Sequence, residues 1–266
     1  MKKRVISAII ALIIAIPIFI KGGMLFNIAI YILSMLGLKE FLSIKATKKE
    51  LPVFIDFISY IVMTLIVVSN FEKTNIVFSM DYRIIVGLFL IFLLPTIIYH
   101  DRKKYSIVDG FHLIGGIFFL GVSFSLMILL RNIDLNMLIY LFIITIITDT
   151  YAYLTGMLIG KHKLLEDISP KKTWEGTIGG TFFGVFISTV YFLTVVNSQI
   201  NIFVVILMSL FLSILGQYGD LVFSAIKRYY GKKDFSNIMP GHGGILDRFD
   251  SIIFVILGFM FFITLI

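Results

Sequence analysis

The chain has 266 residues, of which 59% are hydrophobic and 15% are charged, and its mean hydropathy is +1.01. A soluble domain is about half apolar and about a quarter charged. The chain therefore has too few charges to cover a water-facing surface, which excludes both a soluble globular protein and a disordered one. The absence of cysteine excludes disulfides, zinc–thiolate sites and thiol nucleophiles.

Hydrophobic runs recur from end to end, and a membrane-spanning helix needs about 20 predominantly apolar residues. We therefore predict an all-α, polytopic integral membrane protein with about nine transmembrane helices. The runs are 5–20, 22–38, 51–69, 84–99, 107–130, 135–159, 176–196, 200–226 and 251–266. Three of them have only 16 residues, which leaves the count open by about one helix.

The positions of the cations predict the orientation. If residues 1–4 are cytoplasmic and the runs alternate, 19 of the 23 Lys and Arg residues fall on the cytoplasmic side. Cytoplasmic loops carry an excess of Lys and Arg, so we expect the N-terminus in the cytoplasm. The net charge of +7 is then explained by the membrane topology and not by binding to nucleic acid. We therefore expect no nucleic acid partner.

We expect one polytopic membrane unit over residues 1–266. Within it, residues 1–130 form N-terminal, lipid-facing scaffold helices, and residues 135–266 form a catalytic half. The reason is that the two longest polar loops, 160–175 and 227–250, lie in the second half.

The run 200–226 carries polar residues along one stripe of a helix, because they follow one another at steps of mostly three or four. They are Ser209, Ser213, Gly216, Gln217, Asp220, Ser224 and Lys227. The run 135–159 carries Asp149 on the same face as Thr145 and Thr148. A carboxylate at membrane depth costs roughly 3 kcal/mol. Two such acids indicate a hydrated cavity open to the cytoplasm, with helix-packing hydrogen bonds or a cation pathway as alternatives.

Asp109 and His112 also lie in a hydrophobic run, without ligand-like spacing to another histidine. We expect them to cap or pack a helix near its end rather than to form a site.

The loop 227–250 has three parts. The first is a cationic cluster suited to a phosphate-rich substrate, made of Lys227, Arg228, Lys232 and Lys233. The second is the turn Pro240–Gly244, where backbone amides can approach an anion. The third is the pair Asp247 and Asp250, which share a helix face and suit a hard cation such as Mg²⁺.

The loop 160–175 contains Ser169-Pro170, which is typical of a helix start. We therefore expect Lys171, Lys172 and Thr173 in a first helical turn, where free amides favour anions. Beyond it, Gly176, Gly180 and Gly184 at four-residue spacing predict close packing of the following helix.

The segment from Ser224 to Asp250 resembles the signature of phosphatidate cytidylyltransferases, also called CDP-diacylglycerol synthases. It fills the pattern S-x-x-K-R-x(4)-K-D followed by P-G-H-G-G-x-x-D-R-x-D. Upstream, Gly216–Leu221 resembles the family's GQ-x-GDL, Ile168–Gly176 its ISPKKTWEG, and Asp149–Tyr153 its DTGAY. Three positions depart from the family pattern, where Gly, Arg and Glu are common: Tyr151, Met157 and Phe223.

This resemblance implies transfer of CMP from CTP to phosphatidic acid, giving CDP-diacylglycerol and pyrophosphate for phospholipid biosynthesis. It implies a Mg²⁺-dependent homodimer in a bacterial-type inner membrane, with the active site facing the cytoplasm. It also implies a cation site on acids matching Asp220 and Asp247, with which a second, potassium-type cation is associated.

On this basis we expect catalytic roles for Asp220, Asp247, Lys227 and Arg228. Asp250 and Asp149 are expected to help the first two acids hold the metal. The residues expected to bind CTP or the lipid phosphate are Ser169, Lys171, Lys172, Thr173, Ser224, Lys233, His242, Gly243, Gly244 and Arg248.

Two alternatives stay open. A CTP-dependent lipid-alcohol kinase would share basic loops and intramembrane acids but would release CDP. A proton- or cation-coupled transporter would explain Asp149 and Asp220 but would leave residues 224–250 without a purpose.

Overall fold

The computed structural model describes residues 13–72, 82–99, 101, 103–239, 241 and 243–262. The chain forms two compact units, one of Met1–Ile133 with Asp234–Ile245 and one of Asp134–Lys233 with Leu246–Ile266. The units divide at Ile133, and the assignment of scaffold and catalytic roles to the two halves stays a prediction. The loop 234–245 does not follow that division, because it packs with the first unit although it comes late in the sequence.

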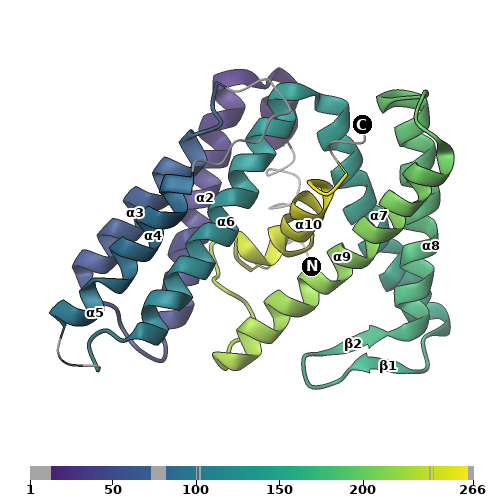
Figure 1. Ribbon diagram of the computed structural model, residues 1–266. Helices are drawn as coiled ribbons and strands as arrows, with labels where there is room; N and C mark the ends of the chain where they lie inside the picture. The colour runs from purple at the N-terminus through teal and green to yellow at the C-terminus, as the bar shows by residue number, and fades with distance from the viewer. Residues whose placement is uncertain are drawn as a thin grey trace. The chain divides into compact units, whose positions relative to one another are not determined.

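The first unit is built around the long helix α6 (Ile107–Ile133), in which every residue from 120 to 130 is buried. Burial on all sides explains why this stretch is apolar around its whole circumference apart from two serines. The helices that pack against α6 are α2 (Gly23–Ala46), α3 (Val53–Val68) and α4 (Tyr82–Leu93), drawn from purple to teal in Figure 1.

Pro95 divides the predicted run 84–99 into two helices. The chain leaves α4 at Leu94 and forms a separate turn, α5 (Pro95–Ile98), with Pro95 at its first position. Proline lacks an amide hydrogen and its ring clashes with the preceding turn, so one continuous helix cannot form here.

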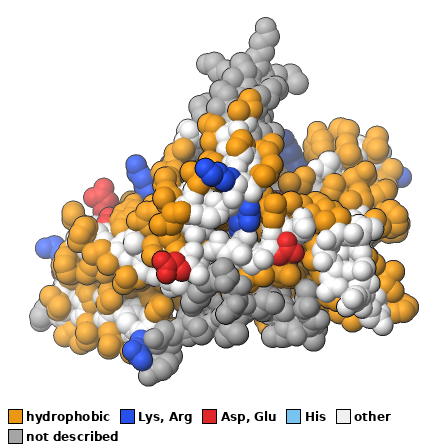
Figure 2. Space-filling model, turned by 90° about the horizontal axis from the view of Figure 1, so that it is seen from above, with side chains coloured by type: hydrophobic (Ala, Val, Ile, Leu, Met, Phe, Trp, Pro, Cys, Tyr) orange, Lys and Arg blue, Asp and Glu red, His pale blue; other side chains and the backbone are white. Residues whose placement is uncertain are grey.

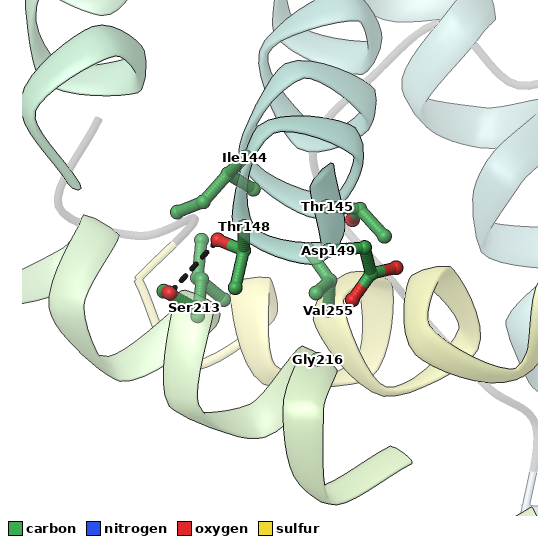
Figure 3. A pocket seen from close by; sticks show the side chains of 8 residues that line it. Ile144, Thr145, Thr148, Asp149, Ser213, Gly216 and Val255 are labelled. Carbon is green, nitrogen blue, oxygen red and sulfur yellow. Dashed lines mark hydrogen bonds between the residues drawn. The ribbon is translucent and has the colours of Figure 1, made fainter. Parts of the chain in front are cut away.

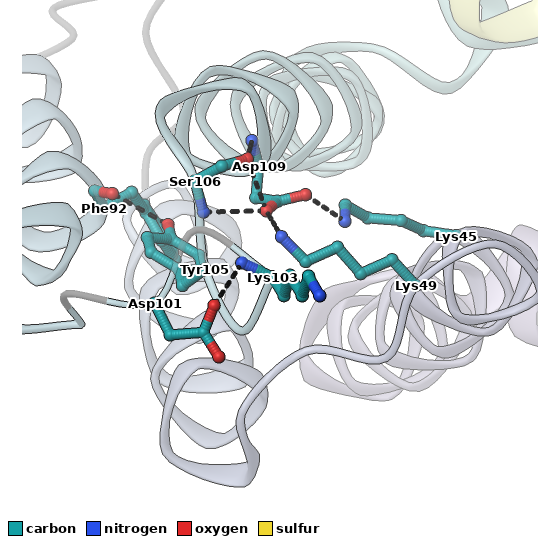
Figure 4. A network of polar contacts seen from close by, with 8 residues as sticks. All are labelled: Lys45, Lys49, Phe92, Asp101, Lys103, Tyr105, Ser106 and Asp109. Carbon is teal, nitrogen blue, oxygen red and sulfur yellow. Dashed lines mark hydrogen bonds and ion pairs between the residues drawn. The ribbon is translucent and has the colours of Figure 1, made fainter.

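A buried ionic network fixes the start of α6 (Figure 4). Asp109 accepts hydrogen bonds from the Ser106 amide at 2.8 Å and hydroxyl at 2.7 Å, which is a capping-box arrangement. Its carboxylate also pairs with Lys45 at 2.6 Å and with Lys49. His112 stacks on Phe41, with ring centroids 4.7 Å apart. The predicted capping and packing roles of Asp109 and His112 are therefore confirmed.

Tyr105 adds a further bond to this network by donating to the Phe92 carbonyl at 2.7 Å. Burial, together with the nearby Asp109 carboxylate, raises the pKa of the Tyr105 hydroxyl above its ordinary value. The hydroxyl therefore remains protonated and continues to donate.

The second unit consists of helices and one hairpin. Its elements are α7 (Leu135–Ile159), β1 (Lys163–Leu165), β2 (Ser169–Thr173), α8 (Trp174–Tyr191), the π-helical turn η1 (Phe192–Val196), α9 (Ile202–Tyr229) and α10 (Leu246–Phe259). Helix α7 packs mainly against α8, while α9 packs against both α8 and α10 (Figure 1).

Three glycines on α8 bring it into close contact with α7. A Cβ at Gly176 would lie 2.6 Å from the Ala152 carbonyl oxygen, and one at Gly180 would lie 2.6 Å from that of Thr148. Gly184 likewise faces the Thr148 hydroxyl. The close packing predicted from the four-residue glycine spacing is confirmed.

The prediction that Lys171, Lys172 and Thr173 lie in the first turn of a helix is wrong. They belong to β2, which pairs antiparallel with β1, and α8 begins only at Trp174. Thr173 has an extended backbone and accepts a hydrogen bond from the Gly176 amide at 3.1 Å, so it is the N-cap. Proline is tolerated in edge strands, and both strands of a two-stranded sheet are edge strands, so Pro170 is compatible with β2.

Five helices are long and apolar enough to cross a membrane: Gly23–Ala46, Ile107–Ile133, Leu135–Ile159, Trp174–Val196 and Ile202–Tyr229. Hydrophobic side chains also make up most of the coloured surface in Figure 2. These features confirm a helical membrane protein, with the β1–β2 hairpin as the exception to an all-α fold.

The predicted count of nine spans is not confirmed. Val53–Val68 is a shorter apolar helix, the apolar segment Arg83–Ile98 is divided by Pro95, and α10 has 14 residues. Half of the run 5–20 lies outside the described residues, as do residues 1–4. The cytoplasmic N-terminus therefore stays a prediction.

We predict that Gly180→Ala destabilises the protein by about 1–3 kcal/mol, because the added methyl group overpacks the contact between α7 and α8. The matched control is Gly115→Ala on α6, where an added Cβ meets nothing within 4 Å. That control should be neutral or slightly stabilising, because alanine favours a helix over glycine. Thermal unfolding of the purified variants in detergent measures both, and equal midpoints would contradict the prediction.

Candidate functional site

Three carboxylates from three helices lie near one another in the second unit. Asp149 on α7, Asp220 on α9 and Asp250 on α10 interact electrostatically, and Asp149 accepts a hydrogen bond from Ser251. The side chain of Asp149 is exposed, and Asp220 and Asp250 are half-buried. These acids are thus accessible to a ligand rather than sealed in the core.

The hairpin supplies the first balancing cation. The Lys172 ammonium on β2 pairs with the Asp220 carboxylate at 2.7 Å, and the two side chains are 24% and 31% exposed. Lys172 also donates to the Gln217 carbonyl at 3.5 Å. Because residues 169–173 form a strand and not a helix, Lys172 lies where it can pair with Asp220 on α9.

A second, more deeply buried pair links α9 to α10. Lys227 and Asp247 are 2.7 Å apart, with side chains only 8% and 5% exposed. Lys227 also interacts electrostatically with Asp250, and Ser224 donates to Asp220 at 3.3 Å. The start of α10 therefore presents Asp247, and Asp250 one turn further on, to the cationic end of α9.

The remainder of the polar stripe on α9 packs against other helices. Ser209 bonds the Tyr140 hydroxyl at 2.8 Å, and Ser213 bonds that of Thr148 at 2.9 Å. Gln217 donates to Thr181 at 2.8 Å. The stripe thus has two parts: its first half forms helix-packing hydrogen bonds, and its second half carries the charges.

A small pocket lies between α7, α9 and α10 and extends to Asp149 (Figure 3). It is too narrow to admit a water molecule, whereas pockets that enclose whole ligands measure roughly 300–1,000 Å³. The lining residues are Ile144, Thr145, Thr148, Asp149, Leu212, Ser213, Gly216 and Val255. It is therefore a gap in the packing beside Asp149 and not a binding site for a nucleotide.

The donor chemistry suits a hard divalent cation, because Asp149, Asp220, Asp247 and Asp250 offer carboxylate oxygens. Within the described ranges, however, no three acidic or histidine side chains are arranged to hold a metal ion. Instead, lysine ammonium groups balance two of the acids. These residues thus offer the oxygen ligands that Mg²⁺ prefers. The ammonium groups of Lys172 and Lys227 must move away from the carboxylates for the metal to bind.

The other predicted residues on the hairpin and near the end of α9 make other contacts or are exposed. Ser169 is paired with Leu165 in the hairpin, Lys171 and Lys233 are exposed, and Thr173 caps α8. Arg228 donates to the Lys232 carbonyl at 2.8 Å.

Of the predicted residues beyond α9, Arg248 is exposed in the first turn of α10. Gly243 and Gly244 belong to the first unit, and His242 lies outside the described residues.

Sequence reasoning missed Glu40 on α2. It is 1% exposed and accepts hydrogen bonds from Ser236 and from the Ile245 amide. The predicted run ended at residue 38, whereas α2 continues to Ala46. The apolar residues Phe41, Leu42 and Ile44 beyond Glu40 are the signal that could have placed this acid inside a helix.

Comparisons with known proteins agree with the motifs. The sequence profile described as the cytidylyltransferase family matches residues 2–266. The phosphatidate cytidylyltransferase of Staphylococcus haemolyticus is 37% identical over 257 residues, 96% of each chain. Those of Staphylococcus aureus and Staphylococcus saprophyticus are 37% and 35% identical over the same share of each chain. The resemblance predicted from the motifs is confirmed.

We predict that the two ion pairs differ in their contribution to stability. Lys227→Met should destabilise the protein by about 3–5 kcal/mol, because it removes the ammonium group that pairs with the buried Asp247 carboxylate. Lys172→Met should cost less than about 1 kcal/mol, because its pair with Asp220 is partly exposed. Thermal unfolding in detergent compares these two substitutions, and a larger cost for Lys172→Met would contradict the assignment.

Proposed function

Because the chain belongs to the cytidylyltransferase family, we propose that it transfers CMP from CTP to phosphatidic acid, giving CDP-diacylglycerol and pyrophosphate. The observation that carries this proposal is the similarity to phosphatidate cytidylyltransferases over 96% of both chains. The charged cluster on α7, α9, α10 and the hairpin supports the same reaction.

The reaction needs no nucleophile from the protein. A phosphate oxygen of phosphatidic acid attacks the α-phosphorus of CTP, a new P–O bond forms, and the bond to the β-phosphate breaks to release pyrophosphate. The chain has no cysteine, and none is required. The difficulty is electrostatic, because two polyanions must approach each other.

The lysines of the cluster address this difficulty. The Lys172–Asp220 pair is partly exposed, so the ammonium can move from the carboxylate to a phosphate when CTP arrives. Lys227 is more deeply buried beside Asp247 and keeps positive charge next to the site. Arg228, Lys171 and Lys233 are further candidates for phosphate contacts, as are the hydroxyls of Ser169, Thr173 and Ser224.

Once Lys172 has turned to the phosphates, the Asp220 carboxylate is free to hold a cation. In this proposal Asp220 and Asp247 would hold Mg²⁺, with help from Asp149 and Asp250. Bound there, the metal would neutralise phosphate charge and stabilise the leaving pyrophosphate. A potassium-type second cation at the same acids belongs to the proposal and rests on the family resemblance alone.

We further propose that the enzyme acts in a bacterial inner membrane as a homodimer, with its site facing the cytoplasm. The apolar helices support residence in a bilayer, from which the lipid substrate can enter sideways. CTP is a water-soluble polyanion and must come from the aqueous side.

Labelled CTP tests the reaction. With purified protein, phosphatidic acid and Mg²⁺, we expect label at the α-phosphate of CTP to enter the lipid and label at the γ-phosphate to leave as pyrophosphate. A lipid-alcohol kinase would give the reverse pattern, with γ-label in the lipid. Ion flux across sealed vesicles in the absence of CTP would indicate a transporter instead.

We predict that Asp220→Asn lowers turnover at least about a hundredfold, because it removes charge from the position where the phosphates and their cation meet. Asp220 is the best acid to test, since it is partly exposed and its loss should leave the fold intact. Asp167→Asn in the exposed turn between β1 and β2 is the matched control. Near-normal turnover of folded Asp220→Asn would refute the assignment.

A further inference from the structure

Glu40 is a buried acid outside the charged cluster. It lies on α2 with 1% of its surface exposed, in the same unit as the loop 234–245. Burying a carboxylate is costly unless hydrogen bonds compensate it. Its position therefore requires partners, and the loop supplies them.

Both ends of the loop bind the same carboxylate oxygen. The Ser236 hydroxyl donates to Glu40 Oε1 at 2.6 Å, and the Ile245 amide donates to it at 2.8 Å. Hydrogen bonds to an ionised acceptor are stronger than those between neutral groups. One side chain thus joins the beginning of the loop to its end.

The glycine-rich turn between these two ends is shaped to fit against Glu40. Met239 and Gly243 form an isolated antiparallel bridge, and Gly241 and Gly243 have positive φ angles of 80° and 85°. A Cβ at Gly244 would lie 2.7 Å from Glu40 Oε2. Gly244 thus lets the backbone reach the acid.

The loop runs directly into α10, because Ile245 is followed by Leu246, the first residue of that helix. Asp247 lies in its first turn, and Asp250 lies in the next turn. Phe235 and Ile245 are buried, so the loop has apolar contacts as well, but Glu40 provides a polar bond at each end.

We infer that Glu40 is a positioning residue that fixes the glycine-rich loop 234–245 through Ser236 and Ile245 and thereby sets the residues leading into α10. This inference rests on the proposed function, since it assigns the loop a part in CMP transfer. Glu40 acts through its hydrogen bonds to the loop.

The test uses full-length protein in detergent with three variants. Glu40→Leu removes the acceptor but keeps a side chain of similar bulk, Glu40→Gln keeps an acceptor oxygen, and Glu50→Leu changes an exposed acid just beyond α2. Hydrogen–deuterium exchange reports on peptides from the loop and from α6. Turnover is measured per folded molecule with CTP and phosphatidic acid.

We expect exchange in the loop to rise and turnover to fall by about tenfold or more in Glu40→Leu, as the loss of hydrogen bonds to a charged group implies. Exchange in α6 should not change. Glu40→Gln should recover most of the turnover, and Glu50→Leu should match the wild type.

Three results would overturn the inference. They are wild-type turnover of folded Glu40→Leu, unchanged loop exchange, or equal loosening of α6, which would make the role of Glu40 merely structural. If Glu40→Leu does not fold, Ser236→Ala removes one donor only, and normal loop exchange and turnover in that variant would overturn it too. If the wild type itself makes no CDP-diacylglycerol, the proposed function fails first, and exchange still shows whether Glu40 holds the loop.

Discussion

The second unit depends on the balance between carboxylates and ammonium groups among apolar helices. Isolated charges at such positions would be unstable, yet Asp149, Asp220 and Asp250 lie near one another. Lys172 and Lys227 make this possible, each bonded to an aspartate at 2.7 Å. The same pairs that stabilise the fold are also the groups that a triphosphate and its cation would rearrange.

The packing of small residues sets the geometry of this cluster. Gly176 and Gly180 allow α8 to approach the carbonyl oxygens of α7, and van der Waals contact of this kind drives helix association in lipid. The hairpin between these two helices is thereby held so that Lys172 reaches α9. A side chain at those glycines would therefore disturb the charges indirectly, by moving the elements that carry them.

Much of the site could be predicted from sequence because its signals are local. The spacing of the α9 stripe identified Asp220 and Lys227, and the motif before α10 identified Asp247 and Asp250. The partner of each acid could not be predicted, since pairing depends on tertiary packing. Ser169-Pro170 led to the wrong prediction of a helical turn, because this dipeptide is compatible with a helix start as well as with an edge strand. The role of Glu40 could not be predicted from the sequence, because it accepts a hydrogen bond from Ile245, which is 205 residues away.

The hydroxyl pairs on α9 bear on the leakage of ions through the helix bundle. Ser209 with Tyr140, and Ser213 with Thr148, satisfy each other without solvent. A continuous file of water along this helix would require both pairs to separate and bond to water instead. The first half of α9 therefore offers protons no ready path through the bundle, whereas the second half carries the partly exposed Lys172–Asp220 pair.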